Sequence, residues 1–534
     1  MSRTTEENRH HLVHSHAHEE DVPGTVNLNA AEGDDTGYGQ ALFPVPAEDP
    51  NDPLQWSNFK KTMILIICSF YSFLANSALL GPSPYIDLWA SEFGISPTQA
   101  SELISYPNLA FGFGSLVFVP LYLKFGRRPI LLVSLIIFCG GIIGASQSTT
   151  YGGLMASRVI HALGSCVCEA LPVQLVNDIF FLHERGERIG YYTVCLCLGS
   201  AASLPAGYIL AGGYGWQLFF YVVFAFGATL LILAFLFVEE TSYDRKAAMI
   251  MSTAPTEEEK ANQGWIERSD APTPPRKSFV KTLSPWGRVD RDVPFFTMMA
   301  RSFTYFLVPQ ALWVIASYGI NIGLLGLAYS YTFPILITSP PYNWTVINSG
   351  LFAIAALVGY ALAVPFTSSS DKLAAYLTKR NGGIREAEMR LGVMLPAMLI
   401  GPAGIILYGI IAEKSLHWVL YFIGGAMSYF AAYFYFSFTL AYAVDSYSSN
   451  FSEMIIAMNL GKQVISFGFG LKVLTWVMES GYAVVLSGIF GGVLLANNLF
   501  LLVFMFWGKD IRIFMSRTWL ATLHSSSIKE VVTH

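Results

Sequence analysis

Three ionisable side chains stand in an otherwise apolar stretch between Tyr151 and Asn177: Arg158, His161 and Glu169. At 1.5 Å per residue, about 25 residues are enough to cross a bilayer. A charge inside such a span is costly unless it faces protein or a water-filled cavity. Arg158 and Glu169 are eleven residues apart, so on a continuous helix they lie on nearly the same face, about 16 Å apart along the axis. The spacing predicts a polar pathway through a membrane.

Each of these side chains also has a structural interpretation. Arg158 could donate hydrogen bonds to carbonyls of a neighbouring helix, and Glu169 could be a protonated, packed carboxyl, because burial disfavours the charged form. A carboxyl that responds to its surroundings is also what a proton-coupled carrier or a cation site needs. We assign Arg158 and Glu169 to a pathway for protons and substrate. His161, one turn from Arg158, is included, although such a histidine is more often a packed core residue.

The composition is that of an integral membrane protein. The chain has 534 residues, of which 53% are hydrophobic and only 13% charged, whereas about a quarter of the residues of a soluble protein are charged. The formal net charge of -5 argues against nucleic acid as a partner. The six cysteines lie in apolar segments and lack the spacing of zinc or redox motifs. We therefore expect neither a metal site nor a cofactor.

The known sequence signatures of ATP-driven pumps and of membrane hydrolases are missing. There is no Gly-x4-Gly-Lys-Ser/Thr sequence for nucleotide binding. There is also no His-Glu-x-x-His motif and no Ser-His-Asp arrangement. The chain is not expected to be an enzyme.

Apolar segments long enough to span a membrane occur in two groups of six. The first group is expected at 62–84, 101–122, 130–148, 152–177, 189–211 and 216–238, and the second at 303–328, 346–367, 391–412, 417–443, 454–474 and 482–507. The fold class is therefore all-α: a polytopic membrane protein with twelve transmembrane helices in two six-helix halves. The expected units are a disordered cytoplasmic N-terminal tail (1–55), an N-terminal bundle (56–239), a cytoplasmic linker (240–300), a C-terminal bundle (301–512) and a cytoplasmic C-terminal tail (513–534).

Positive charge near the span ends gives the orientation. Most Lys and Arg residues fall on one side, together with both termini and the linker, while the loops on the other side hold a single basic residue, Lys414. Both termini are thus expected in the cytoplasm, with the plasma membrane as the location. The sequence Asn343-Trp344-Thr345 lies on the outer side and predicts glycosylation of Asn343.

Polar residues on other spans could complete the pathway. Asn76 on the first span could line a cavity, although hydrogen bonding between helices explains such residues equally well. Lys462 on the eleventh span could extend its ammonium to the membrane interface or contact the substrate. Both are included among the pathway residues.

A tight basic turn recurs at equivalent places in the two halves. After the second span the chain reads Gly126-Arg127-Arg128, and after the eighth it reads Asp371-Lys372 and continues to further basic residues. Such repetition is what an internal duplication leaves behind. In carriers built of two halves, rocking around a central site makes and breaks contacts at such turns. We expect these five residues to gate the cytoplasmic side.

With these motifs the chain resembles the major facilitator superfamily, in the fungal branch grouped with twelve-span drug:proton antiporters. The resemblance covers residues 50–515. Gly126, Arg127 and Arg128 match the family's loop motif, although Leu123 stands where the family has Asp. Arg158 resembles the Arg of the fourth-span motif, which is implicated in proton transfer.

The resemblance implies a secondary active transporter that works by alternating access and couples transport to protons. Its substrates would be small organic molecules such as drugs, toxins or secondary metabolites, and export is the expected direction. The expected partners are the substrate, protons and the lipid bilayer, and the chain is expected to act as a monomer. The alternatives are proton-driven uptake of polyamines or other organic cations, and a nutrient sensor built on a transporter scaffold.

Overall fold

The computed structural model describes residues 18–19, 25–27, 49–243, 278–284, 295–446, 451–520 and 523. Within this part of the chain, twelve helical segments are long and apolar enough to cross a membrane, which confirms the predicted number. They are Asn58–Phe93, Pro97–Phe125, Arg127–Ser146, Tyr151–Ile179, Glu184–Ala211, Gln217–Phe237, Pro309–Thr338, Asn348–Arg380, Ala387–Lys414, Val419–Ala443, Ser452–Ser480 and Ala483–Ser516.

The first six spans pack together as one half. Their α-helices are α2 (Asn58–Leu80), α3 (Ile86–Phe93), α4 (Pro97–Phe125), α5 (Arg127–Ser146), α6 (Tyr151–Ser165), α7 (Val167–Ile179), α8 (Leu182–Leu198), α9 (Ser203–Ala211) and α10 (Gln217–Phe237).

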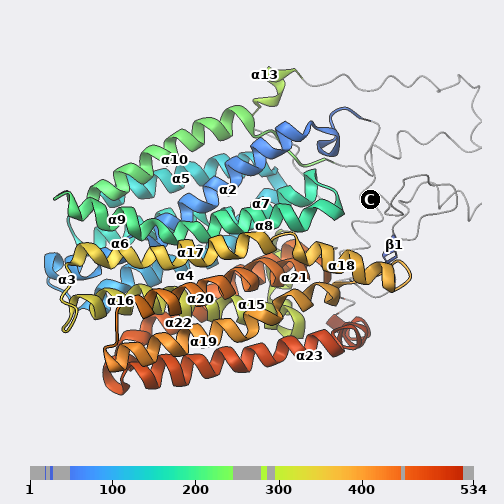
Figure 1. Cartoon of the computed structure of the whole chain (residues 1–534). Coiled ribbons are helices and arrows are strands. Elements are labelled where there is room, and N and C mark those ends of the chain that lie inside the picture. Colours follow the sequence, from blue (N-terminus) through green and yellow to red (C-terminus); the bar gives the residue numbers. More distant parts are fainter. Residues whose placement is uncertain are drawn as a thin grey trace, which may run out of the picture.

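The second half follows a similar plan. Its α-helices are α14 (Phe295–Thr304), α15 (Pro309–Ile320), α16 (Ala328–Thr338), α17 (Ala353–Ala363), α18 (Ser369–Arg380), α19 (Leu395–Lys414), α20 (Val419–Phe434), α21 (Leu440–Ser446), α22 (Phe451–Ser480) and α23 (Gly491–Ser516). Short 3₁₀ and π segments connect several helices of the two halves. They are η3 (Gly199–Ala202) in the first half and η6 (Asn321–Leu327), η7 (Val346–Phe352), η9 (Ala387–Met394), η10 (Tyr435–Thr439) and η12 (Ala483–Phe490) in the second. In Figure 1 the helices of both halves run with their long axes in similar directions.

Local sequence explains where several spans begin. The hydroxyls of Ser57, Ser96 and Thr150 accept hydrogen bonds from backbone N–H groups in the first turns of α2, α4 and α6, at 3.4, 3.1 and 3.2 Å. Such N-caps satisfy donors that the helix leaves unpaired. The prediction for the seventh span, 303–328, begins six residues and ends ten residues before the span Pro309–Thr338 of the structure. Pro309 begins α15, and no charged residue between Arg301 and Asp371 marks the boundaries of this region.

Small residues allow the two halves to approach closely. A Cβ at Gly112 of α4 would lie 2.8 Å from the side chain of Gln463 on α22. The hydroxyls of Ser105 on α4 and Tyr331 on α16 are 2.8 Å apart. Glycine at such contacts lets helix backbones pack closely within a membrane.

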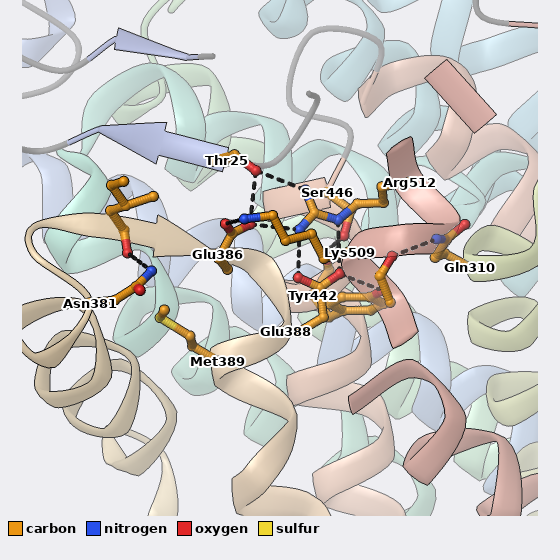
Figure 2. Close-up of polar contacts among 12 residues, drawn as sticks. Thr25, Gln310, Asn381, Glu386, Glu388, Met389, Tyr442, Ser446, Lys509 and Arg512 are labelled. Carbon is orange, nitrogen blue, oxygen red and sulfur yellow. Dashed lines mark hydrogen bonds and ion pairs between the residues drawn. The ribbon is translucent and has the colours of Figure 1, made fainter. Parts of the chain in front are cut away.

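A small sheet lies at the end of the bundle where α2 begins and α23 ends, here called the tail end. Strands β1 (His18–Glu19), β2 (Thr25–Asn27) and β3 (Ile384–Glu386) form an antiparallel sheet in which Thr25 pairs with Glu386 (Figure 2). The first two strands belong to the segment 1–55, for which the sequence predicted disorder, so these five residues depart from that expectation. Strand pairing depends on a partner more than 350 residues away and leaves no local signal.

Parts of the predicted tails and linker lie outside the described residues. These are most of 1–48, including four of the five histidines of the N-terminal tail, and most of 244–294 and 521–534. Within the linker, the structure describes the helix α13 (Phe279–Thr282) and the start of α14.

Candidate functional site

A central cavity lies between the two halves. It encloses about 750 Å³ of empty space, including its solvent-open part. The first half contributes residues of α2, α4, α7 and α8, and the second half contributes residues of α15, η6, α17, α20 and α22. The lining residues are Asn76, Leu79, Leu80, Asn108, Phe111, Cys168, Glu169, Leu196, Cys197, Ser200, Tyr318, Asn321, Ile322, Leu325, Gly326, Tyr360, Tyr429, Ala432, Phe436, Lys462 and Gln463.

A proline shapes the fourth span where it reaches the cavity. This span is divided into α6 and α7, and Pro172 within α7 has no N–H to donate to the carbonyl of Cys168. The hydroxyl of Ser72 on α2 donates to that carbonyl instead, at 2.5 Å. The hydroxyl of Tyr192 on α8 donates to the next carbonyl, that of Glu169, at 3.1 Å. Neighbouring helices thus fix the backbone of the first turn of α7.

The carboxylate of Glu169 forms an ion pair with the ammonium of Lys462 across the cavity. One partner stands on α7 and the other on α22, so the ion pair joins the two halves. The side chains are only 12% and 3% exposed. Lys462 therefore lies in the cavity wall rather than extending to the membrane interface. Its Nζ also lies 5.3 Å from the centre of the Tyr318 ring, within the range of a cation–π contact.

Asparagine side chains add polarity to the same cavity. Asn76 donates to the carbonyl of Leu196 on α8 at 2.7 Å, so it both lines the cavity and bonds between helices. Asn108 and Asn321 donate to carbonyls one turn earlier on their own helices, at 3.1 and 2.7 Å. Both interpretations that the sequence left open for Asn76 hold at once.

Arg158 does not line the cavity. It is fully buried, and its guanidinium donates to the carbonyls of Leu103, Leu79 and Ala78 at 2.5, 2.9 and 3.3 Å. It also lies 5.7 Å from the ring of Trp89. This cation therefore ties α6 to α4 and α2. The predicted continuous face from Arg158 to Glu169 is wrong, because the span is divided between them and the two side chains turn to different neighbours.

His161 is likewise away from the cavity. Its ring packs edge-on against Phe138 with 6.1 Å between the ring centres, and its backbone leaves no room for a Cβ at Gly141. Neither ring nitrogen has a hydrogen-bond partner among the described residues. The structure places this histidine in the core of the first half.

The basic turn of the first half bonds to its own half and to the linker that follows it. The backbone N–H groups of Arg127 and Arg128 donate to the carboxylate of Glu240 at 3.0 and 3.2 Å. Gly126 has a φ of 100°, and the same carboxylate leaves no room for a side chain there. The guanidinium of Arg127 pairs with Asp178 at 3.1 Å.

The corresponding turn of the second half reaches the other half. Asp371 pairs with Arg390 at 2.6 Å and packs so closely on Gly186 of α8 that a Cβ there has no space. Arg390 also pairs with Asp445. Burial alone would raise the pKa of the Asp445 carboxyl, but Arg390 and Arg385 outweigh it and hold that pKa below its ordinary value. Lys372 is exposed.

Sequence reasoning missed Asp445, although a signal for it exists. Asp445 follows the tenth span, as Asp178 ends the fourth, and each pairs with an arginine from the basic turn region of its own half. A residue-by-residue comparison of the two halves would have found it.

A second polar cluster lies at the tail end (Figure 2). The sequence did not predict it, because its residues, like the paired strands, lie far apart in the chain. Arg512 of α23 donates to Glu388 at 2.8 and 2.5 Å, to Glu386 at 2.9 Å and to the hydroxyl of Thr25 at 3.3 Å. Lys509 pairs with Glu386 at 2.6 Å. Burial would raise the pKa of Glu386, but its bonds to Lys509, Thr25 and Arg512 outweigh burial and lower it.

Asn343 lies at the end of the bundle opposite the tail end. It follows α16 in an exposed turn and has a positive φ of 49°. This position suits a modification that needs access from solvent, and glycosylation of Asn343 stays a prediction.

Comparisons with known proteins agree with this architecture. The family model described as Major Facilitator Superfamily matches residues 65–471. An uncharacterized MFS-type transporter of Schizosaccharomyces pombe is 24% identical, with 82% of each chain covered. The probable efflux pump mfs2 of Aspergillus flavus is 26% identical over 73% of this chain and 88% of its own. Among solved structures, the xylose transporter XylE of E. coli is similar in fold, with a TM-score of 0.55, 13% identity and coverage of 84% of this chain and 98% of its own.

Proposed function

The chain belongs to the Major Facilitator Superfamily, and from that premise we propose that it is a proton-coupled secondary transporter that moves a small organic molecule by alternating access. The observation that carries the proposal is the Glu169–Lys462 ion pair, which joins the two halves across the central cavity. The moving bodies would be residues 56–239 and 301–512, and the substrate would bind between them.

Protonation of Glu169 would change the balance between the conformations of the carrier. Removing one partner of a buried ion pair leaves the other charge uncompensated, at a cost of about 3–5 kcal/mol. A two-state equilibrium moves from 1:99 to 99:1 with about 5.5 kcal/mol. Because each half contributes one partner, this cost falls on the form in which the halves meet at the pair. A proton on Glu169 would therefore shift the balance toward a form in which they separate there, by much of the free energy that such a reversal needs.

The tail end would open by separating Asp371 from α8. Asp371 lies on the second half and packs on Gly186 of the first, so this contact must break when the halves part. Arg390 would hold the carboxylate on its own half during the movement. Arg127 and Arg128 bond to Asp178 of the same half and to Glu240 at the start of the linker, so this turn would stay attached to the first half and the linker during the movement.

We infer export as the direction and the plasma membrane as the location. The similarity to a probable efflux pump supports export. The basic residues gathered at the tail end support a cytoplasmic position for both termini. Proton-driven uptake of polyamines or other organic cations is the alternative, because Glu169 also suits a cation. Comparing cells with and without the protein separates the two: export lowers the internal level of a substrate and uptake raises it.

The first prediction concerns Glu169→Gln, which removes the titratable group at nearly constant volume. Substrate flux driven by a proton gradient in proteoliposomes should fall at least tenfold, because the protein no longer binds a proton at the junction of its halves. Glu479→Gln, which changes an exposed carboxyl on the same helix as Lys462, is the matched control and should transport normally. Proton-driven flux that survives in Glu169→Gln would reject the proposed coupling.

A further inference from the structure

The central cavity carries one positive and one negative charge in a wall that is otherwise uncharged. Among the described residues that line it, only Glu169 and Lys462 have a carboxyl or an amine group. The rest of the lining is largely apolar and aromatic, including Tyr318, Tyr360 and Tyr429. A substrate that enters the cavity therefore meets a single salt bridge, Glu169–Lys462. It either leaves this salt bridge intact or replaces it.

When a substrate replaces this salt bridge, the charged groups that it carries decide whether Glu169 and Lys462 both keep a counter-ion. A ligand with an ammonium group alone would take Glu169 and leave the ammonium of Lys462 buried without a counter-ion. A ligand with a carboxylate alone would take Lys462 and leave Glu169 in the same position. Leaving a charge buried and unpaired is costly in either case. Among ligands that displace the ion pair, only one that carries both groups leaves no charge unpaired.

We propose that the substrates of this cavity are aromatic zwitterions, with an ammonium that binds Glu169 and a carboxylate that binds Lys462. This inference rests on the proposed transport function. The ligand would bridge α7 and α22, and so the two halves, in place of the internal ion pair. Tyr318, which already lies 5.3 Å from the Lys462 ammonium, would offer its ring to the aromatic part of the ligand.

The same geometry decides whether protons and substrate move in the same direction or in opposite directions. A proton on Glu169 removes the partner of the substrate's ammonium, so proton and substrate compete for one carboxylate. Ligands that exclude each other are exchanged rather than carried together, which gives antiport. Acidification should therefore weaken binding of a zwitterion.

The test uses one ring system with different charges on purified, full-length protein. Equilibrium dialysis with radiolabelled tryptophan, and competition by tryptamine and indole-3-propionate, measures affinity for the zwitterion, the amine and the acid. At pH 7 tryptophan should bind at least tenfold more tightly than either competitor, and any fall in its affinity on acidification should be lost in Glu169→Gln.

Variants should change this preference in opposite directions. Glu169→Gln should prefer indole-3-propionate, and Lys462→Gln should prefer tryptamine, whereas a purely structural role would weaken all three ligands alike. The double variant Glu169→Lys with Lys462→Glu keeps both charges and the ion pair. It should keep the preference for tryptophan, which separates loss of specificity from loss of folding.

Two results would overturn the inference. One is a wild-type protein that binds tryptamine or indole-3-propionate as tightly as tryptophan; the other is no measurable tryptophan binding at millimolar concentration. If a fluorescent organic dye is still moved by a proton gradient in the same preparation, transport stands and only the substrate class fails. If the gradient moves neither dye nor tryptophan, the proposed function itself fails.

Discussion

At the scale of single residues, the three ionisable side chains of the fourth span have separate roles. Glu169 forms an ion pair with Lys462 in the cavity lining, Arg158 binds backbone carbonyls, and His161 packs in the core. The hydropathy pattern marked all three as unusual, because charges in apolar spans are rare. It could not rank them, because their partners come from other helices. The partner of Glu169 is 293 residues away in the sequence, and no periodicity within one span identifies it.

The structure predicts that Arg158 contributes to stability and not to proton transfer. Arg158→Lys keeps the charge but cannot reach three carbonyls with one compact ammonium. Losing about two bonds from a charged donor should lower the free energy of unfolding by roughly 3–6 kcal/mol. The measurement is a thermal melt in detergent together with proton-driven flux for each folded molecule, and the flux should have the wild-type pH profile. A shifted pH profile with an unchanged melting temperature would instead place Arg158 in the proton pathway.

At the scale of elements, the twelve spans follow directly from the sequence, whereas their interruptions do not. Long apolar segments predict helices because a membrane leaves the backbone no other hydrogen-bond partners. Inside the second part of the fourth span, Ser72 and Tyr192 bond from α2 and α8 to the carbonyls of Cys168 and Glu169. The first of these carbonyls is the one that Pro172 leaves without its helical partner. The sequence shows the proline but not which neighbours compensate for it.

Pro172→Ala tests whether this interruption serves the cavity. Alanine restores an N–H that can donate to Cys168, and relief of an internal proline is worth up to about 3 kcal/mol when the helix can straighten. We expect a melting temperature equal to or above that of the wild type, but a severalfold lower rate of transport, because α7 would turn Glu169 away from Lys462. Pro402→Ala makes the same change inside α19, at a position that does not line the cavity, and should leave the rate unchanged. A fast Pro172→Ala carrier would show that the shape of α7 is not needed for transport.

At the scale of the whole molecule, the tail end holds the two halves together in two ways. Asp371 packs on α8, and the strand Thr25–Asn27, which precedes the first half in the chain, pairs with β3 of the second half. Thr25 is buried against Glu386 and Arg512. We expect an opening of the tail end to release this strand.

Deleting residues 1–27 should therefore shift the carrier toward the form that is open at the tail end. Cys197 lines the cavity, so a variant that keeps this cysteine alone can report opening by its rate of reaction with a water-soluble maleimide. We expect the deletion to raise that rate severalfold, with Thr25→Ala having a smaller effect in the same direction. The variant Thr98→Ala, changed near the start of α4 and away from the sheet, is the control.

Acid should also shift the carrier toward the form that is open at the tail end, and the direction of this pH effect follows from Glu386. Its pKa is lower in the folded protein than in the unfolded chain, so its contribution to stability is complete above the unfolded value and is lost as pH falls through the folded value. In the Cys197-only protein with Glu169→Gln, which removes the other proposed proton site, the labelling rate should be divided by that of a free thiol at the same pH, because acid also removes the reactive thiolate. This relative rate should rise below about pH 4, where free glutamate carboxyls protonate. The same protein without residues 1–27 should lose this acid-dependent acceleration. If both proteins respond equally to acid, the strand does not restrain the tail end.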